Sequence, residues 1–169
     1  MTIADLQLFS AKLISQEQQN ALPPDCTLRP LQRDDHTKGL LRLLSQLSNI
    51  GDVSPEAFEE QFNMMKRQES YYIIVVEQRE RIVACATLVV EHKFLHGCSK
   101  AGHIEDVVVD DSQRGKRLGS RLIDQLVHIA KQVGCYKTIL NCSHENVPFY
   151  EKCSFKNTAV QMACYFDTN

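Results

Sequence analysis

The feature of this sequence that most restricts the fold is an apolar strand followed at once by a long amphipathic helix. Residues 103–109 (HIEDVVV) are apolar and β-branched, which is typical of a strand. After a turn that contains glycine, apolar side chains recur every three or four positions from Leu118 to Val133. This spacing predicts a helix with one apolar face. Residues 136–141 (YKTILN) then supply another strand, so the segment predicts a β-α-β unit within a mixed sheet.

The other expected elements surround this unit. Residues 71–77 and 82–91 are apolar runs joined by a short polar turn, which predicts an antiparallel hairpin. We predict further strands at 27–31 and 160–166, and helices at 36–49, from Ser54-Pro55 onward, and at 145–152. Residues 1–25, with a short helix bearing Leu6, Phe9 and Leu13, form an N-terminal extension, and 26–169 form one α/β (α+β) domain.

Composition excludes several classes of protein. The 169 residues are 43% hydrophobic and 24% charged, which is ordinary for one globular domain. The formal net charge of −2 gives no broad attraction to nucleic acid or to an anionic membrane. No apolar run has the length of a membrane span or a signal peptide. The seven cysteines include no CxxC pair, so we expect no metal site, and instead reduced thiols, mostly small core residues, in a cytoplasmic protein.

The turn before the long helix predicts an anion site. A helix that begins near Gly115 would expose unpaired backbone N–H groups and the positive end of its dipole. Arg114, Lys116 and Arg117 add charge, and the glycine lets the backbone approach a pyrophosphate. Neither a P-loop (GxxxxGK[ST]) nor a dinucleotide fingerprint (GxGxxG) is present.

The run from Arg114 to Gly119 resembles motif A of the GCN5-related N-acetyltransferases (GNAT superfamily), Arg/Gln-x-x-Gly-x-Gly/Ala. Arg117 stands where most relatives have glycine, and a helical first turn would tolerate this. Four further segments occur in order: EHKFLH (91–96), GHIEDVVV (102–109), GCYK (134–137) and NVPFYEK (146–152). Together they resemble the glucosamine 6-phosphate N-acetyltransferases, a eukaryotic enzyme family of UDP-N-acetylglucosamine biosynthesis.

The resemblance implies a GNAT fold with a mostly antiparallel sheet. It implies that the amine of glucosamine 6-phosphate attacks acetyl-CoA directly, in a cytoplasmic homodimer without a metal. The cofactor residues that it implies are Val107, Val108, Val109, Arg114, Gly115, Lys116, Arg117, Leu118, Gly119, Ser120, Asn146 and Tyr150.

The resemblance also implies the catalytic and sugar-binding residues. Tyr150 would face the CoA sulfur, Asn141 would contact the amine through its carbonyl, and Glu105 and Asp106, on opposite faces of a strand, would bind the substrate. Relatives usually have a carboxylate at Asn141, where asparagine keeps the carbonyl but removes that charge. They often have an arginine near Tyr165, where one phosphate contact is either missing or replaced by a hydroxyl. The implied sugar-binding residues are Ser48, Lys93, Phe94, Leu95, His96, Glu105, Asp106, Val107, Tyr136 and Lys137.

Three alternatives remain open from the residues alone. The first is a cysteine nucleophile: Cys142 lies two positions before His144, which could act as its base, although no third, orienting group is evident. The second alternative is an acetyltransferase of the same fold whose acceptor is a protein amine or a polyamine. A non-enzymatic acyl-CoA-binding module is the third alternative.

Overall fold

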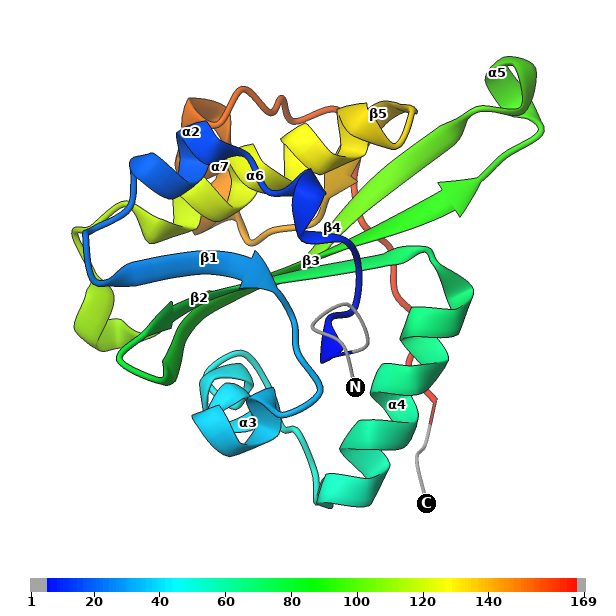
Figure 1. The fold of residues 1–169 in the computed structure, drawn as a ribbon. Coiled ribbons are helices and arrows are strands. Elements are labelled where there is room, and N and C mark those ends of the chain that lie inside the picture. The colour runs from blue at the N-terminus through cyan, green and yellow to red at the C-terminus, as the bar shows by residue number, and fades with distance from the viewer. Residues whose placement is uncertain (1–5, 167–169) are drawn as a thin grey trace.

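The computed structural model describes residues 6–166, and its centre is one five-stranded sheet of order β1-β2-β3-β4-β5 (Figure 1). Neighbouring strands from β1 to β4 are antiparallel, and β4 and β5 are parallel. The mixed, mostly antiparallel sheet is therefore confirmed. The strands are β1 (Cys26–Pro30), β2 (Tyr71–Gln78), β3 (Arg81–His92), β4 (Lys100–Val109) and β5 (Cys135–Leu140).

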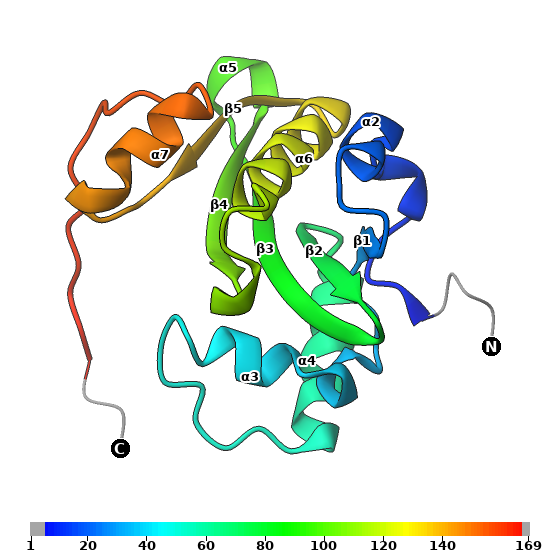
Figure 2. The same cartoon turned by 90° about the vertical axis from the view of Figure 1, so that its left-hand side faces the viewer.

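Helices cover the two faces of the sheet (Figure 2). The long helix α6 (Leu118–Gln132) packs with its apolar stripe on β2, β3 and β4, as its spacing predicts. The opposite face carries α3 (Leu40–Leu44) and α4 (Pro55–Gln68). The Ser54 side chain accepts a hydrogen bond from the Ala57 N–H, and Pro55 occupies the first turn, so the predicted start of α4 is confirmed.

One buried side chain of α6 helps to fix the N-terminal segment to the domain. Gln125 of α6 is fully buried; its Oε1 accepts from the Ser15 N–H (2.8 Å) and its Nε2 donates to the Leu13 carbonyl (2.9 Å). The predicted single N-terminal helix is wrong, because η1 (Ala11–Leu13) and α2 (Gln16–Asn20) are separate short turns, each with its own serine cap.

The predicted helix 36–49 is also wrong. The chain forms a 3-10 turn, η2 (Asp35–Lys38), and only then α3, because Gly39 between them has a left-handed backbone (φ +86°). Asp35 is not a cap; its buried carboxylate binds the Arg29 guanidinium at 2.6 and 2.9 Å. Arg29 also pairs with Glu77 of β2, so this buried cluster fixes the start of the α3 segment to the sheet.

Three differences concern the later segments. The loop between β3 and β4 holds a short helix, α5 (Leu95–Cys98), at the tip of a hairpin that projects beyond the sheet (Figure 1). The predicted helix 145–152 is a 3-10 turn, η4 (His144–Asn146), followed by α7 (Val147–Lys152). The predicted strand 160–166 is absent, because this segment pairs with no strand among the described residues; Val160, Met162, Tyr165 and Phe166 are 83–92% exposed.

The cysteines divide between the core and the surface. Cys26 and Cys85 are buried, Cys135 and Cys153 are partly buried against the core, and Cys98, Cys142 and Cys164 are exposed. Four of the seven therefore lie in the core or against it, as expected.

Gly102 offers a test of how tightly α6 packs on the sheet. A Cβ at Gly102 would lie 2.8 Å from Leu88 Cδ1 and 3.2 Å from Thr138 Cγ2. Gly102→Ala should therefore lower the free energy of unfolding by about 1–3 kcal/mol, measured by urea denaturation. Adding Leu88→Val, which removes the contacted branch, should make the combined loss smaller than the sum of the two single losses. Additive losses would contradict the proposed clash.

Candidate functional site

The candidate site begins where β4 and β5 stop pairing. Their parallel register runs to Ile104 and Leu140. Among the described residues, no strand pairs on the β5 side with the rest of β4, from Glu105 to Val109. Figure 2 shows the two strands diverging toward their C-terminal ends. The free main-chain groups of this β4 edge can pair with an extended ligand as an added strand would.

The acidic pair lies at a β-bulge on this free edge. The β3–β4 register shifts between Cys85↔Val108 and Thr87↔Glu105, and Asp106 has a left-handed backbone (φ +52°). The extra residue interrupts the alternation of side chains. Glu105 and Asp106 are both exposed. Burial on the α3 side raises the pKa of the Cys85 thiol, and the negative charge of Asp106 raises it further. The prediction of strict alternation to opposite faces therefore fails here.

The three valines after the bulge have different side-chain environments. Val107 and Val109 pack against the core under α6, whereas Val108 is buried in the core on the α3 side. Their side chains are thus occupied by packing. Their main-chain groups on the β5 side are the part available to a ligand.

Helix α6 begins later than predicted, at Leu118. Arg117 is its N-cap residue, with a left-handed backbone (φ +59°), and no side chain caps the first turn. The position that is usually glycine in motif A thus has the conformation that glycine adopts without strain, and the expectation of an ordinary helical residue is wrong. Gly115 is also left-handed (φ +84°), and a Cβ there would meet nothing within 4 Å.

The turn before α6 is held in place by Asp110, which the sequence reasoning missed. Its carboxylate accepts hydrogen bonds from the Ser112 N–H (3.0 Å) and Oγ (2.5 Å) and from Arg81 of β3 (2.9 Å). The bonds from Ser112 are the main reason that the pKa of Asp110 is lowered. The pattern Asp-x-Ser directly after a strand is a signal of such a turn. The pKa of Asp110 is lowered slightly further by the side chain of Gln46, which follows α3. Ser48, two residues later, lies exposed in the loop between α3 and α4.

Two of the three cations in this turn have protein partners. Arg114 binds Asp111 on the surface (2.6 Å), and the Lys116 Nζ donates to the Gln113 side chain (2.7 Å). Within residues 6–166, Arg117 forms no side-chain hydrogen bond or ion pair. Leu118 is buried, so it offers only backbone; the Ser120 hydroxyl donates to the Arg117 carbonyl (2.9 Å).

Helix α7 lies beside the first turn of α6. A Cβ built on Gly119 would be 3.3 Å from the Phe149 ring and 3.7 Å from Val109, so glycine is needed here for packing. Asn146 is the N-cap residue of α7, and Tyr150 lies on its last turn. Burial raises the pKa of Tyr150, and the nearby Cys142 and Cys153 raise it further, so its hydroxyl is protonated at neutral pH.

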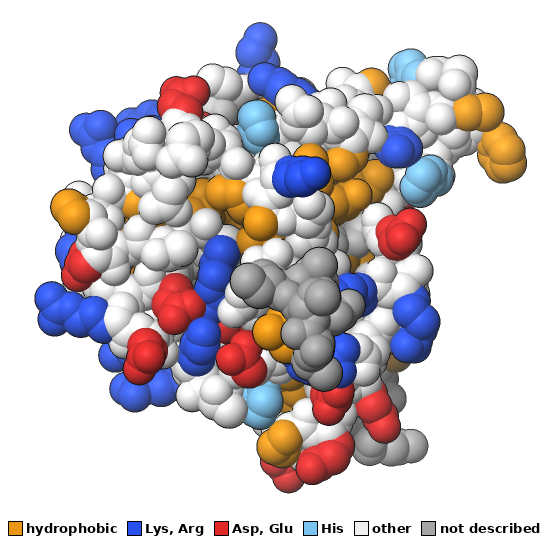
Figure 3. Space-filling view, viewed as in Figure 1, with side chains coloured by type: hydrophobic (Ala, Val, Ile, Leu, Met, Phe, Trp, Pro, Cys, Tyr) orange, Lys and Arg blue, Asp and Glu red, His pale blue; other side chains and the backbone are white. Residues whose placement is uncertain are grey.

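A second group of predicted residues lies at the other end of β5. The His96 and Tyr136 rings are 4.2 Å apart, and the Lys137 Nζ lies 5.4 Å from the Tyr136 ring centre. Lys93 is separate, bound to Glu91 at 2.6 Å, and Glu91 also binds His103 (2.9 Å). At the hairpin tip, Phe94 is 95% and Leu95 67% exposed, and hydrophobic side chains gather there in the space-filling view (Figure 3).

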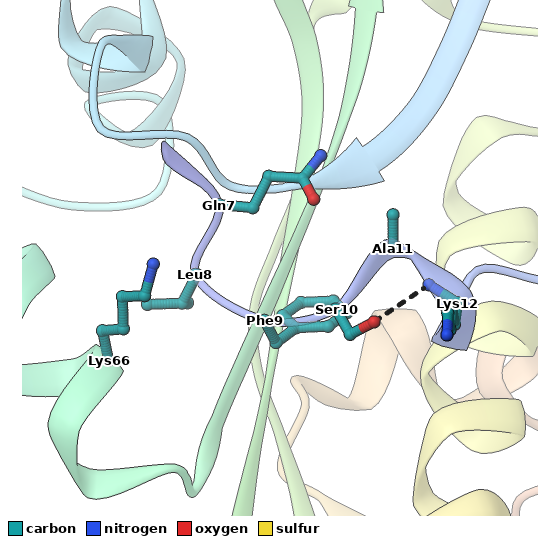
Figure 4. A pocket seen from close by; sticks show the side chains of 7 residues that line it. All are labelled: Gln7, Leu8, Phe9, Ser10, Ala11, Lys12 and Lys66. Carbon is teal, nitrogen blue, oxygen red and sulfur yellow. Dashed lines mark hydrogen bonds between the residues drawn. The ribbon is translucent and has the colours of Figure 1, made fainter. Parts of the chain in front are cut away.

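Other potential sites are less well supported. An open hollow of about 410 Å³, lined by Gln7–Lys12 and Lys66, lies along the N-terminal segment and contains none of the predicted site residues (Figure 4). No hydrogen bond joins Cys142 to His144 in the described chain, so the geometry gives a cysteine nucleophile no base. Residues 6–166 contain no cluster of three or more His, Cys, Asp or Glu arranged to hold a metal, and no helix among them has the length and apolarity of a membrane span.

Comparison with known proteins agrees with this geometry. The model of the acetyltransferase (GNAT) family matches residues 33–155. The chain belongs to the GNAT family. The fold is accordingly the GNAT fold, and GNAT acetyltransferases use acetyl-CoA as the acetyl donor.

Individual relatives of this GNAT chain carry more specific names. Glucosamine 6-phosphate N-acetyltransferase 1 of Dictyostelium discoideum is 47% identical over 145 residues, covering 84% of this chain and 92% of that protein. The enzyme from Candida albicans is 41% identical, covering 86% and 99%. The crystal structure of glucosamine-6-phosphate N-acetyltransferase from Arabidopsis thaliana superposes with a TM-score of 0.82 at 43% identity, covering 84% of this chain and 99% of that chain.

The left-handed backbone of Arg117 generates a prediction about stability. Arg117→Gly should raise the free energy of unfolding by about 1 kcal/mol, because glycine adopts this conformation without the clash of a Cβ. Thermal or urea unfolding measures the gain. Arg117→Ala is the matched control, since it removes the guanidinium but keeps the Cβ. An equal gain from both variants would show that charge, and not backbone strain, sets the effect.

Proposed function

We propose that this GNAT enzyme transfers the acetyl group of acetyl-CoA to the amine of glucosamine 6-phosphate. The observation that carries the proposal is the free β4 edge, from Glu105 to Val109, which leads directly to an uncapped helix N-terminus. This arrangement suits an extended thioester arm that ends in a pyrophosphate. The acceptor is inferred from the relatives, which are named for glucosamine 6-phosphate and align over most of the chain.

The proposed cofactor contacts use main-chain and side-chain groups that are available for binding. The main chain of Val107, Val108 and Val109 would pair with the pantetheine arm. The first-turn N–H groups of α6 and the open backbone at Gly115 would hold the pyrophosphate. Arg114, Lys116 and Arg117 would add positive charge, and Arg117 is the most available because its side chain has no protein partner among residues 6–166.

The reaction needs a neutral amine, an oriented thioester and stabilised charge on the thioester oxygen and the departing sulfur. A main-chain N–H of the β4 edge would donate to the thioester oxygen. Tyr150, protonated at neutral pH, would donate a hydrogen bond or a proton to the departing sulfur. The main-chain carbonyl of Asn141, just past β5, would accept from the amine, and Asn146 would contact the cofactor.

The sugar would lie against the acidic pair at the bulge. Glu105 and Asp106 are exposed, and their carboxylates are suited to hold an ammonium or hydroxyl groups; Ser48, in an exposed loop, would add a hydroxyl contact. The Lys137 ammonium, with the rings of His96 and Tyr136 beside it, suits the phosphate. Lys137 is in register with Ala101, four residues before Glu105, which is about 13 Å along the strand at 3.3 Å per residue.

That separation favours a homodimer, in which a second copy supplies part of the phosphate site. Independent support comes from the exposed surface. The outer edge of β5 has no partner strand among the described residues, and the apolar C-terminal side chains Val160, Met162 and Phe166 are 83–91% exposed. Free edges and apolar segments of this kind are normally covered. We further propose a cytoplasmic location and a role in UDP-N-acetylglucosamine biosynthesis, as the resemblance implies.

The acceptor is tested by measuring CoA release from acetyl-CoA with glucosamine 6-phosphate and with glucosamine. Release should be rapid only with the phosphorylated sugar, and Lys137→Ala should raise KM for that sugar by about tenfold or more, since a charged hydrogen bond contributes about 1.5–3 kcal/mol. KM for acetyl-CoA should change little. Lys156→Ala, in the exposed C-terminal segment, is the charge-matched control.

Each alternative predicts a different result in this assay. Equal rates with both sugars would remove the phosphate site from the proposal. Turnover with a polyamine or peptide amine alone would assign another acceptor. No CoA release with any amine would favour an acyl-CoA-binding module.

The homodimer is tested by placing charges on one side or the other of the C-terminal segment, in which apolar and other side chains alternate. If this segment pairs as a strand with its apolar side covered, Val160→Asp with Met162→Asp should shift the protein from dimer to monomer in analytical ultracentrifugation. Gln161→Asp with Ala163→Asp places the same charges on the other side and should leave the dimer intact. A monomeric unmodified protein would contradict the homodimer.

A further inference from the structure

Tyr150 takes part in the turn that ends α7, and this turn is closed by two main-chain hydrogen bonds. The Ser154 N–H donates to the Glu151 carbonyl (3.0 Å), and the Phe155 N–H donates to the Tyr150 carbonyl (3.0 Å). Ser154, which directly precedes Phe155, has a left-handed backbone (φ +69°). These two hydrogen bonds and the left-handed residue define a Schellman motif at the end of α7.

The motif brings an aromatic ring back onto Tyr150. In a Schellman motif the residue after the left-handed position packs against the residue whose carbonyl it binds. Here these are Phe155 and Tyr150, and their rings meet edge to face with centres 6.3 Å apart. The Tyr150 ring also meets Phe149 edge to face, with ring centres 4.9 Å apart. Both neighbouring rings are partly buried and pack against the core under α6.

Phe149 is itself held by rigid elements. Its ring lies against Gly119 in the first turn of α6, where an added Cβ would be 3.3 Å from the ring. Tyr150 therefore has one aromatic neighbour that packs on α6 and another that the turn at Ser154 brings back toward it. Tyr150 itself is half-buried.

We infer that Phe155 is a positioning residue, which the Schellman turn at Ser154 holds against Tyr150 so that the phenol keeps a fixed direction. This inference rests on the proposed role of Tyr150 as donor to the departing sulfur. A small displacement of a group that acts on reacting atoms can lower a rate about a hundredfold. Phe155 makes no such contact itself, and its effect must pass through Tyr150.

A double-mutant cycle separates positioning from general stability. Phe155→Leu should lower kcat about tenfold and change KM for acetyl-CoA less than about twofold, because a misdirected phenol impairs the chemical step more than binding. In a Tyr150→Phe background, Phe155→Leu should cause no further loss of kcat. Phe155→Tyr, which retains an aromatic ring, should restore kcat to within about twofold of the unmodified enzyme.

Two matched controls sharpen the test. Phe9→Leu removes a similar edge-to-face contact, with Tyr72 at 5.2 Å, and should leave kcat unchanged. Ser154→Val disfavours the left-handed backbone while leaving Phe155 in place, so it should lower kcat as Phe155→Leu does. Ser154→Gly favours that backbone and should retain kcat. The Ser154 pair also keeps the test decisive if Phe155→Leu does not fold.

The outcomes distinguish the inference from the function on which it rests. Equal loss of kcat from Phe155→Leu in both backgrounds would overturn positioning through Tyr150 while leaving the role of Tyr150 intact. An unchanged kcat in Phe155→Leu and Ser154→Val would do the same. An unchanged kcat in Tyr150→Phe would instead overturn the proposed role of Tyr150, and the positioning inference with it.

Discussion

The site depends on one constraint: β4 and β5 pair only as far as Ile104 and Leu140. Beyond that point β4 continues for five residues with its hydrogen-bonding edge free. Free main-chain groups bind an extended ligand without regard to side chains. The valines of this edge can therefore serve the core and the cofactor together, and the same divergence gives α7 its place beside α6.

Non-glycine residues with left-handed backbone lie at three points around this divergence. Asp106 forms the bulge, Arg117 precedes α6, and Ser154 ends α7. Such conformations cost free energy, and they persist where the surrounding structure fixes them. Here hydrogen bonds of neighbouring residues do so: Asp110 fixes the turn before α6, and the Tyr150 carbonyl fixes the turn after α7. The GNAT site is thus built from strained turns attached to a rigid sheet.

Local signals in the sequence predicted much of this fold correctly. Ser54 and Pro55 begin α4, the apolar stripe forms α6, and the runs on either side of residues 79–80 form the β2–β3 hairpin. Each of these depends on neighbouring residues or on one repeating period. The errors arose where a distant contact decides. Asp35 binds Arg29, which also binds Glu77, and these contacts fix the turn that Gly39 ends. Residues 160–166 have no partner strand among the described residues, although their alternation requires one.

The sequence by itself determined which local features are available to the site: an apolar strand, a glycine turn before a helix, a tyrosine and an acidic pair. Motif spacing carries this information because each motif lies within a few residues. Only the tertiary structure decided how they meet. The bulge at Asp106, the left-handed Arg117 and the return of Phe155 onto Tyr150 depend on strand register and backbone torsion. Packing between distant segments sets both, and no local pattern specifies them.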